Sequence, residues 1–175
     1  MRGTAWRAAV EALEAEGVQY AFGLPGNPLH LVADLEGSSV RPILARNEST
    51  AVFMAYGYAR ASRTVGIAFG NPGPGTTNMV SGILEADSAC VPLIALSNGT
   101  VTRNDGAGAL QELDVQTLMR PVTKWSTKVL HADRMGWTMR RAFQPAMPRR
   151  RDRVDVETPV PALPSAIDAP AKERA

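Results

Sequence analysis

The stretch Val91-Pro-Leu-Ile-Ala-Leu-Ser97 decides the fold class of this chain of 175 residues. The stretch is almost continuously apolar, whereas a strand with one face in water alternates apolar and polar side chains. A short apolar run of this kind is typical of a strand buried on both faces, as in a parallel sheet covered by helices. The sequence therefore predicts an α/β domain.

Segments on both sides of this run alternate between strand-like and helix-like patterns. Strands are predicted over residues 18–22, 41–45, 65–69 and 91–97, with a strand or extended segment over 122–129. Helices are predicted over residues 4–16, 47–61, 76–87, 111–119 and 132–146, and from Pro28 onward with Asn27 as the N-cap. Gly17 suits the C-terminal cap of the first helix. This alternation predicts a parallel sheet flanked by helices on both faces.

Sheets of this kind bind ligands at the carboxyl ends of their strands. Here those ends are residues 23–26, 46–48 and 70–75, and the segment from Ser97 onward. We therefore expect the chemistry of the protein in these four loops.

Glu48 opens a predicted helix, where a carboxylate stabilises the helix dipole without any further role. The segment around it, Arg46-Asn-Glu-Ser-Thr-Ala-Val-Phe-Met-Ala-Tyr-Gly-Tyr-Ala-Arg60, resembles the E-x-x-A-x-x-M-A-x-G-Y-A-R signature of thiamine diphosphate-dependent enzymes. It is similar to the pyrimidine-binding domain of the acetolactate synthase and benzoylformate decarboxylase superfamily. Further blocks agree in order and spacing over about residues 4–145: Phe22-Gly-Leu-Pro-Gly26, Gly73-Pro-Gly-Thr-Thr-Asn78, Val91-Pro-Leu-Ile-Ala-Leu96, Gly108-Ala-Leu-Gln-Glu-Leu-Asp114 and Arg120-Pro-Val-Thr-Lys124.

The resemblance implies thiamine diphosphate as the cofactor and Glu48 as the catalytic residue. In the family a glutamate at this position hydrogen-bonds N1′ of the aminopyrimidine ring, and this favours the tautomer that accepts the C2 proton. A carboxylate does this well in a dry, preorganised site. The cofactor-binding residues implied by the same matching are Pro25, Gly26, Pro74, Asn78 and Gln111.

The resemblance also implies a 2-oxo acid substrate and a lyase or transferase reaction. Decarboxylases similar to the benzoylformate enzyme carry a proton-transferring histidine near the position of Asn71. An asparagine amide is no general acid or base at neutral pH. This difference favours a carboligase of the acetolactate synthase type over a decarboxylase.

The chain lacks the Gly-Asp-Gly motif and distal asparagine with which the family binds the diphosphate through Mg²⁺. We therefore expect a diphosphate-binding domain or subunit as partner, no metal site in this chain, and no activity of the chain alone. Two other interpretations stay open: a truncated or frame-shifted, catalytically silent remnant that acts only as a folded or partner-binding module, and a different doubly wound domain that binds a nucleotide.

The domain is predicted to occupy residues 1–145, followed over 146–175 by an irregular tail rich in proline and arginine, with Arg149-Arg-Arg151 as a solvated charge run. The net charge of +2 argues against nucleic acid as the main partner. No apolar run approaches the roughly 18 residues that cross a bilayer, so a cytoplasmic protein is expected.

Three further expectations concern packing. An Ala- and Gly-rich face around residues 51–59 and 76–86 is expected to be exposed and to drive formation of a homo- or hetero-oligomer. Cys90 is expected to be a small core residue. His30 and His131 have no spaced partners and are not expected to bind metal.

Overall fold

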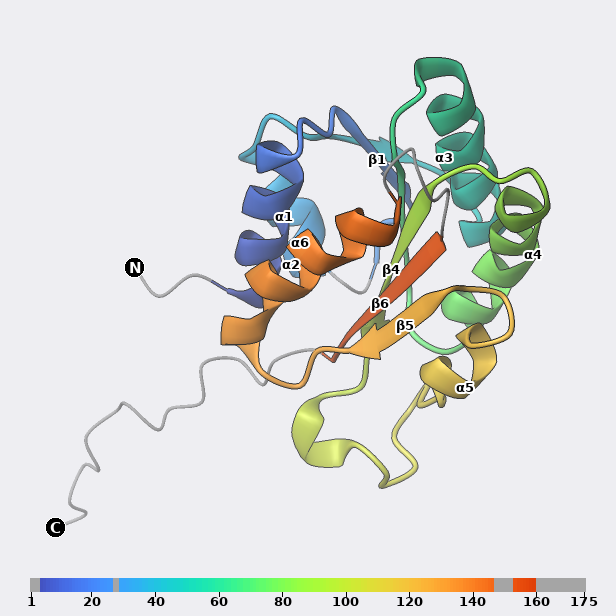
Figure 1. The fold of residues 1–175 in the computed structure, drawn as a ribbon. Coiled ribbons are helices and arrows are strands. Elements are labelled where there is room, and N and C mark those ends of the chain that lie inside the picture. Colours follow the sequence, from blue (N-terminus) through green and yellow to red (C-terminus); the bar gives the residue numbers. More distant parts are fainter. Residues whose placement is uncertain (1–3, 27–28, 147–152, 160–175) are drawn as a thin grey trace, which may run out of the picture.

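The computed structural model describes residues 4–26, 29–146 and 153–159 of the chain (Figure 1). Within these residues, six parallel strands form one sheet in the order β2-β1-β3-β4-β6-β5. The strands are β1 (Tyr20–Gly23), β2 (Arg41–Leu44), β3 (Gly66–Gly70), β4 (Leu93–Gly99), β5 (Trp125–Lys128) and β6 (Arg153–Pro159). The main helices are α1 (Ala5–Ala15), α2 (Leu29–Glu36), α3 (Glu48–Ser62), α4 (Pro74–Ser88), α5 (Val115–Met119) and α6 (Met135–Ala146).

Helices cover both faces of the sheet, as the sequence predicts (Figure 1). Helices α1, α2 and α6 pack on one face around a core that contains Trp6, Leu35 and Met139. Helices α3, α4 and α5 pack on the other face around a core that contains Val52, Met79 and Met119. The central strands β3 and β4 are buried along their whole length, which confirms the interpretation of the apolar run at residues 91–97.

Local signals place the helix ends. The Thr4 side chain accepts a hydrogen bond from the backbone N–H of Arg7 and caps α1. Gly17 follows the C-cap residue Glu16 with a φ of +73°, the left-handed conformation that glycine adopts most easily. Helix α4 begins at Pro74, two residues before the predicted start, because proline fits the first turn of a helix. The predicted cap at Asn27 and Pro28 lies outside the described residues.

The C-terminal region differs from the prediction. The segment Arg153–Pro159 is not irregular: it forms β6, which pairs with β4 on one side and β5 on the other. Val156 lies fully buried in the core, in line with the alternation of Val154, Asp155, Val156 and Glu157. The prediction of an irregular tail is therefore wrong for this segment, whereas residues 147–152 and 160–175 lie outside the described part.

The expected exposed Ala- and Gly-rich face is wrong for its alanines, although the large apolar residues Phe53 and Leu84 in the same ranges are exposed. Ala51, Ala55 and Ala59 on α3 are fully or almost fully buried, because α3 packs closely against α4 and the sheet. A Cβ at Gly82 would lie 2.7 Å from Val52 Cγ1, so this glycine permits the close packing of the two helices. Phe53, on the outer side of α3, is 44% exposed.

Cys90 is exposed, so the prediction of a small core residue is wrong as well. It follows α4 and has a φ of +52°, in the turn that leads into β4. Its apolar neighbour Val91 is buried instead. No helix in the described residues is long and apolar enough to cross a membrane.

Candidate active site

The order of the strands places a site at the carboxyl ends of β1, β2 and β3. The chain runs from β1 outward to β2 and then returns to the other side of β1 to form β3. The loops that follow β1 and β3 therefore leave the sheet toward opposite faces, and ligands bind in the crevice at such a switch point. Three of the four loops selected by the sequence meet there.

Glu48 is the first residue of α3, at the end of the loop that follows β2. Asn47 caps the helix: its side-chain oxygen accepts a hydrogen bond from the backbone N–H of Ser49 at 2.8 Å. This cap fixes the first turn and directs the Glu48 side chain inward, where it is only 4% exposed. A carboxyl group buried to this degree requires hydrogen-bond partners.

Both oxygens of Glu48 have such a partner. The side-chain amide of Asn71, directly after β3, donates to Oε1 at 3.1 Å. The side-chain amide of Asn78, one turn into α4, donates to Oε2 at 3.1 Å. The two amides hold the carboxyl group in one orientation at the carboxyl ends of the strands. Each oxygen keeps a second lone pair for a further donor.

Two glycines make room for this cluster, because they have no Cβ atom. A Cβ at Gly75 would lie 2.6 Å from Glu48 Oε1 and 2.8 Å from Asn71 Cβ. A Cβ at Gly26 would lie 2.7 Å from Asn71 Oδ1. The loop after β1 therefore contacts Asn71, which in turn contacts Glu48. Only glycine at these two positions permits the approach without a shift of the cluster.

The other residues that the resemblance implies lie around this cluster. Pro25 lies beside Gly26 in the loop after β1, and Pro74 is the exposed first residue of α4. Gln111 has a φ of +63°, and a Cβ at Gly73 would lie 2.6 Å from its backbone oxygen. The fold thus places these residues in loops that adjoin the cluster, while their roles toward a cofactor stay predictions.

Asn71 is the residue whose place in the site the sequence reasoning missed. The sequence indicates Asn71 only as the residue that stands in place of a histidine, and no motif indicates its hydrogen bond to Glu48. The signal available was its position directly after a buried strand, beside a glycine-rich turn. Such a position points to the site but does not show which side chain the amide contacts.

A carboxylate orders the loop that carries Gln111. Glu112 accepts hydrogen bonds from the backbone N–H groups of Gly106 and Ala109, the latter at 2.8 Å. These bonds lower the pKa of Glu112, because they stabilise its charged form. Lys128 at the end of β5 pairs with Asp105 at 2.7 Å and ties the same loop to the sheet.

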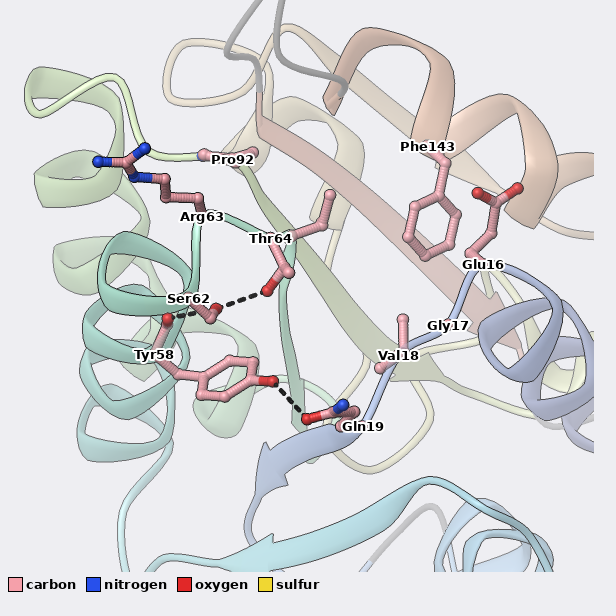
Figure 2. A pocket seen from close by; sticks show the side chains of 11 residues that line it. Glu16, Gly17, Val18, Gln19, Tyr58, Ser62, Arg63, Thr64, Pro92 and Phe143 are labelled. Carbon is pink, nitrogen blue, oxygen red and sulfur yellow. Dashed lines mark hydrogen bonds between the residues drawn. The ribbon is translucent and has the colours of Figure 1, made fainter.

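A hollow of 440 Å³ lies at the opposite end of the sheet, beside the amino ends of its strands (Figure 2). Val18, Val65 and Phe143 give it an apolar lining. Tyr58 donates to Gln19 Oε1 at 3.3 Å on its rim, and the hydroxyls of Ser62 and Thr64 lie 2.7 Å apart. None of the predicted site residues lines this hollow.

The arrangement at the switch point defines a class of site. A buried carboxyl group held by two amides, with glycines beside it, fits a polar ring that donates a hydrogen bond to the carboxylate. In the described residues no group of three or more His, Cys, Asp or Glu could hold a metal ion.

Comparison with known proteins identifies the family. Residues 3–118 match the family described as thiamine pyrophosphate enzyme, N-terminal TPP binding domain, and the chain belongs to this family. It is 37% identical over 162 residues to a probable acetolactate synthase large subunit of Methanocaldococcus jannaschii. The aligned part covers 92% of this chain and 27% of the relative.

Two further relatives are named for different activities. The chain is 38% identical over 152 residues to the acetolactate synthase large subunit of Haemophilus influenzae, covering 86% of the chain and 26% of that protein. It is 34% identical over 168 residues to a probable 2-ketoarginine decarboxylase of Pseudomonas aeruginosa, covering 94% of the chain and 30% of that protein. The chain thus spans about a quarter to a third of the length of these relatives.

Proposed function

We propose that this chain is the pyrimidine-binding domain of a thiamine diphosphate-dependent 2-oxo acid carboligase or decarboxylase of the acetolactate synthase type. The observation that carries the proposal is the buried Glu48, whose two oxygens are held by Asn71 and Asn78 at the switch point of the sheet. The relatives of this chain include both acetolactate synthases and a decarboxylase. Asn71, which cannot transfer protons, favours carboligation.

When bound, thiamine diphosphate supplies an electron sink for cleavage of the bond beside a 2-oxo acid carbonyl. Glu48 accepts a hydrogen bond from the pyrimidine ring and stabilises positive charge on that ring. Asn71 and Asn78 keep the carboxyl group in place, so that no reorganisation is needed when the charge develops. The low exposure of Glu48 keeps water away from this hydrogen bond and strengthens it.

The remaining predicted residues bind rather than react. Pro25 and Gly26 line the pyrimidine site from the loop after β1. Pro74 and Gln111 contact the cofactor from the loops near α4, and Asn78 is shared between the cofactor and Glu48. These positions follow the carboxyl ends of strands, where parallel sheets bind ligands, and this supports the proposed roles.

The diphosphate end of the cofactor requires a partner in this proposal. Mg²⁺ binds diphosphate through oxygen ligands in octahedral geometry, and a diphosphate-binding domain of the same or another polypeptide supplies them. We propose that the working enzyme is a homo- or hetero-oligomer in the cytoplasm. The acetolactate synthase relatives are several times as long as the part that matches this chain, so they have room for such a module.

A chimera tests the proposal. This chain replaces the matching N-terminal part of the Haemophilus influenzae acetolactate synthase large subunit, and exchange of the C2 proton of the bound cofactor is followed by NMR after rapid quenching. We expect exchange in the chimera and a loss of about a hundred- to a thousandfold in Glu48→Gln, because the amide has no negative charge. The matched control Glu85→Gln changes an exposed glutamate on α4 and leaves exchange unaltered.

Two outcomes would contradict the proposal. Equal exchange in the chimera and its Glu48→Gln variant would remove Glu48 from the reaction and leave the chain as a folded, partner-binding module. A folded chimera that does not bind thiamine diphosphate would show that the crevice is not the pyrimidine site.

A further inference from the structure

A row of arginine and tryptophan side chains lies on the outer side of α6 and the neighbouring strand β5. The guanidinium carbons of Arg134 and Arg141 lie 4.7 and 5.5 Å from the centre of the Trp137 ring. Arg141 also lies 5.5 Å from the centre of the Trp125 ring on β5. We call these four residues the arginine–tryptophan surface. Helices α1 and α6 cover the same face of the sheet (Figure 1), and Trp125 packs against the core on that face.

Three of the four residues are exposed and Trp125 is half-buried, and the two arginines give the surface a positive charge. Trp137 is 46% exposed, and Arg134 and Arg141 are exposed. Within the described part of the chain, neither arginine forms an ion pair, whereas the exposed Arg7 pairs with Glu11 at 3.0 Å. Asp133 is the acidic neighbour in the sequence, and Arg140 adds another positive charge to the same helix. Arginine and tryptophan are also the residue types most enriched at the energetic centres of interfaces.

The contacts between guanidinium groups and aromatic rings indicate what this surface binds. A guanidinium that lies on an aromatic ring keeps its N–H edge free, and that edge matches a carboxylate in a bidentate geometry. Contact with the ring restricts the long arginine side chain before binding, so less conformational entropy is lost when a partner docks. Both properties favour a partner with carboxylate groups.

Nucleic acid fits the surface less well. Single-stranded nucleic acid binds by stacking its bases on aromatic faces, and here guanidinium groups already lie over the Trp137 and Trp125 rings. The net charge of the whole chain is only +2, which gives a weak field for a polyanion.

We propose that the arginine–tryptophan surface docks an acidic segment of a partner protein, with carboxylates of the segment bound by Arg134 and Arg141. The surface belongs to the face of the domain that carries α1 and α6, whereas Glu48 lies at the start of α3 on the other face. This docking is therefore a separate function from cofactor binding, and Glu48→Gln leaves it intact.

The test uses the full chain and a fluorescently labelled polyglutamate peptide, with binding followed by fluorescence anisotropy at low salt. We expect saturable binding that weakens as salt rises. The double substitution Arg134→Gln and Arg141→Gln weakens binding at least about tenfold, because it removes both cationic groups at the centre of the surface. Trp137→Ala weakens binding as well, since both guanidinium groups lose their support.

A matched control distinguishes the surface from general electrostatic attraction. Arg41 lies 5.9 Å from the centre of the Tyr20 ring, so Arg41→Gln removes a similar contact elsewhere on the molecule and leaves binding unchanged. Circular dichroism of each variant verifies the fold. If Trp137→Ala unfolds, the double arginine variant still tests the surface, because it retains both tryptophans. An equal loss in Arg41→Gln, or no saturable binding of polyglutamate, overturns the proposal. Tighter binding of oligouridylate than of polyglutamate overturns the choice of an acidic protein segment.

Discussion

Gly75 and Gly57 occupy helices under opposite constraints. Gly75 lies in the first turn of α4, where a Cβ would come within 2.6 Å of Glu48 Oε1. Gly57 lies in the middle of α3, where a Cβ would meet nothing within 4 Å. The first glycine maintains the site, whereas the second only weakens its helix.

Alanine substitutions separate these two effects. We expect Gly75→Ala to lower the free energy of unfolding by about 1–3 kcal/mol, because the new methyl group displaces Glu48 or Asn71. We expect Gly57→Ala to raise it by about 0.5–1 kcal/mol, because alanine is the better helix former. Urea denaturation of the two variants and the unchanged chain measures both. Equal stability of the Gly75→Ala variant and the unchanged chain would show that the cluster around Glu48 relaxes freely.

The sequence predicts Glu48 as a residue of the site, but it does not predict the hydrogen bonds that hold its carboxyl group. Its position at a helix start after a strand, and the signature around it, both follow from local order along the chain. The bonds from Asn71 and Asn78 join segments 23 and 30 residues away from Glu48. Such contacts depend on how strands and helices pack in three dimensions, which no local pattern contains.

At the scale of elements, the structure contains the predicted strands and helices wherever the hydrophobic pattern is clear. Strand β6 was missed because its short alternation of valine with charged residues lies among arginines and prolines, which are typical of irregular segments. Its place between β4 and β5 is also out of chain order, since β5 precedes it in the sequence and lies at the edge of the sheet. Spatial order of this kind follows from packing, not from sequence position.

The loop between β4 and α5 gives a prediction of pH dependence. Because backbone hydrogen bonds from Gly106 and Ala109 lower the pKa of Glu112, the charged form stabilises the folded loop. This contribution is fully present above the pKa of the unfolded chain and is lost as the pH falls through the lowered pKa of the folded state. We expect the backbone amides of Gly106 and Ala109 to exchange faster with solvent as Glu112 becomes protonated.

NMR titration measures this effect directly. The carboxyl resonance of Glu112 should titrate below the usual range for glutamate, and Glu112→Gln should remove the pH dependence of amide exchange at Gly106. An ordinary titration of Glu112 would contradict the hydrogen bonds that the structure places there. Asp114 has a lowered pKa from its bonds to Thr117, so its resonance must be assigned separately.

At the scale of the whole molecule, the sheet separates two cores with different tasks. The core between the sheet and α3, α4 and α5 supports the loops that hold Glu48. The core on the other face supports α6 and the arginine–tryptophan surface. A partner can therefore occupy each face without competing for the same side chains.

The residues of the candidate site lead to a prediction about the activity of the chain by itself. We expect the purified chain, mixed with thiamine diphosphate, Mg²⁺ and pyruvate, to show no turnover. In the proposed function, the site offers one carboxyl group and neutral amides to the pyrimidine end of the cofactor, while most of the charge of the cofactor is on its diphosphate. Without the Mg²⁺ clamp of a partner module, the electrostatic part of the binding energy is missing. The chimera with the Haemophilus influenzae protein, assayed in parallel for product formation, serves as the positive control. Turnover of pyruvate by the chain alone would refute the need for a partner, because this domain would then hold both ends of the cofactor.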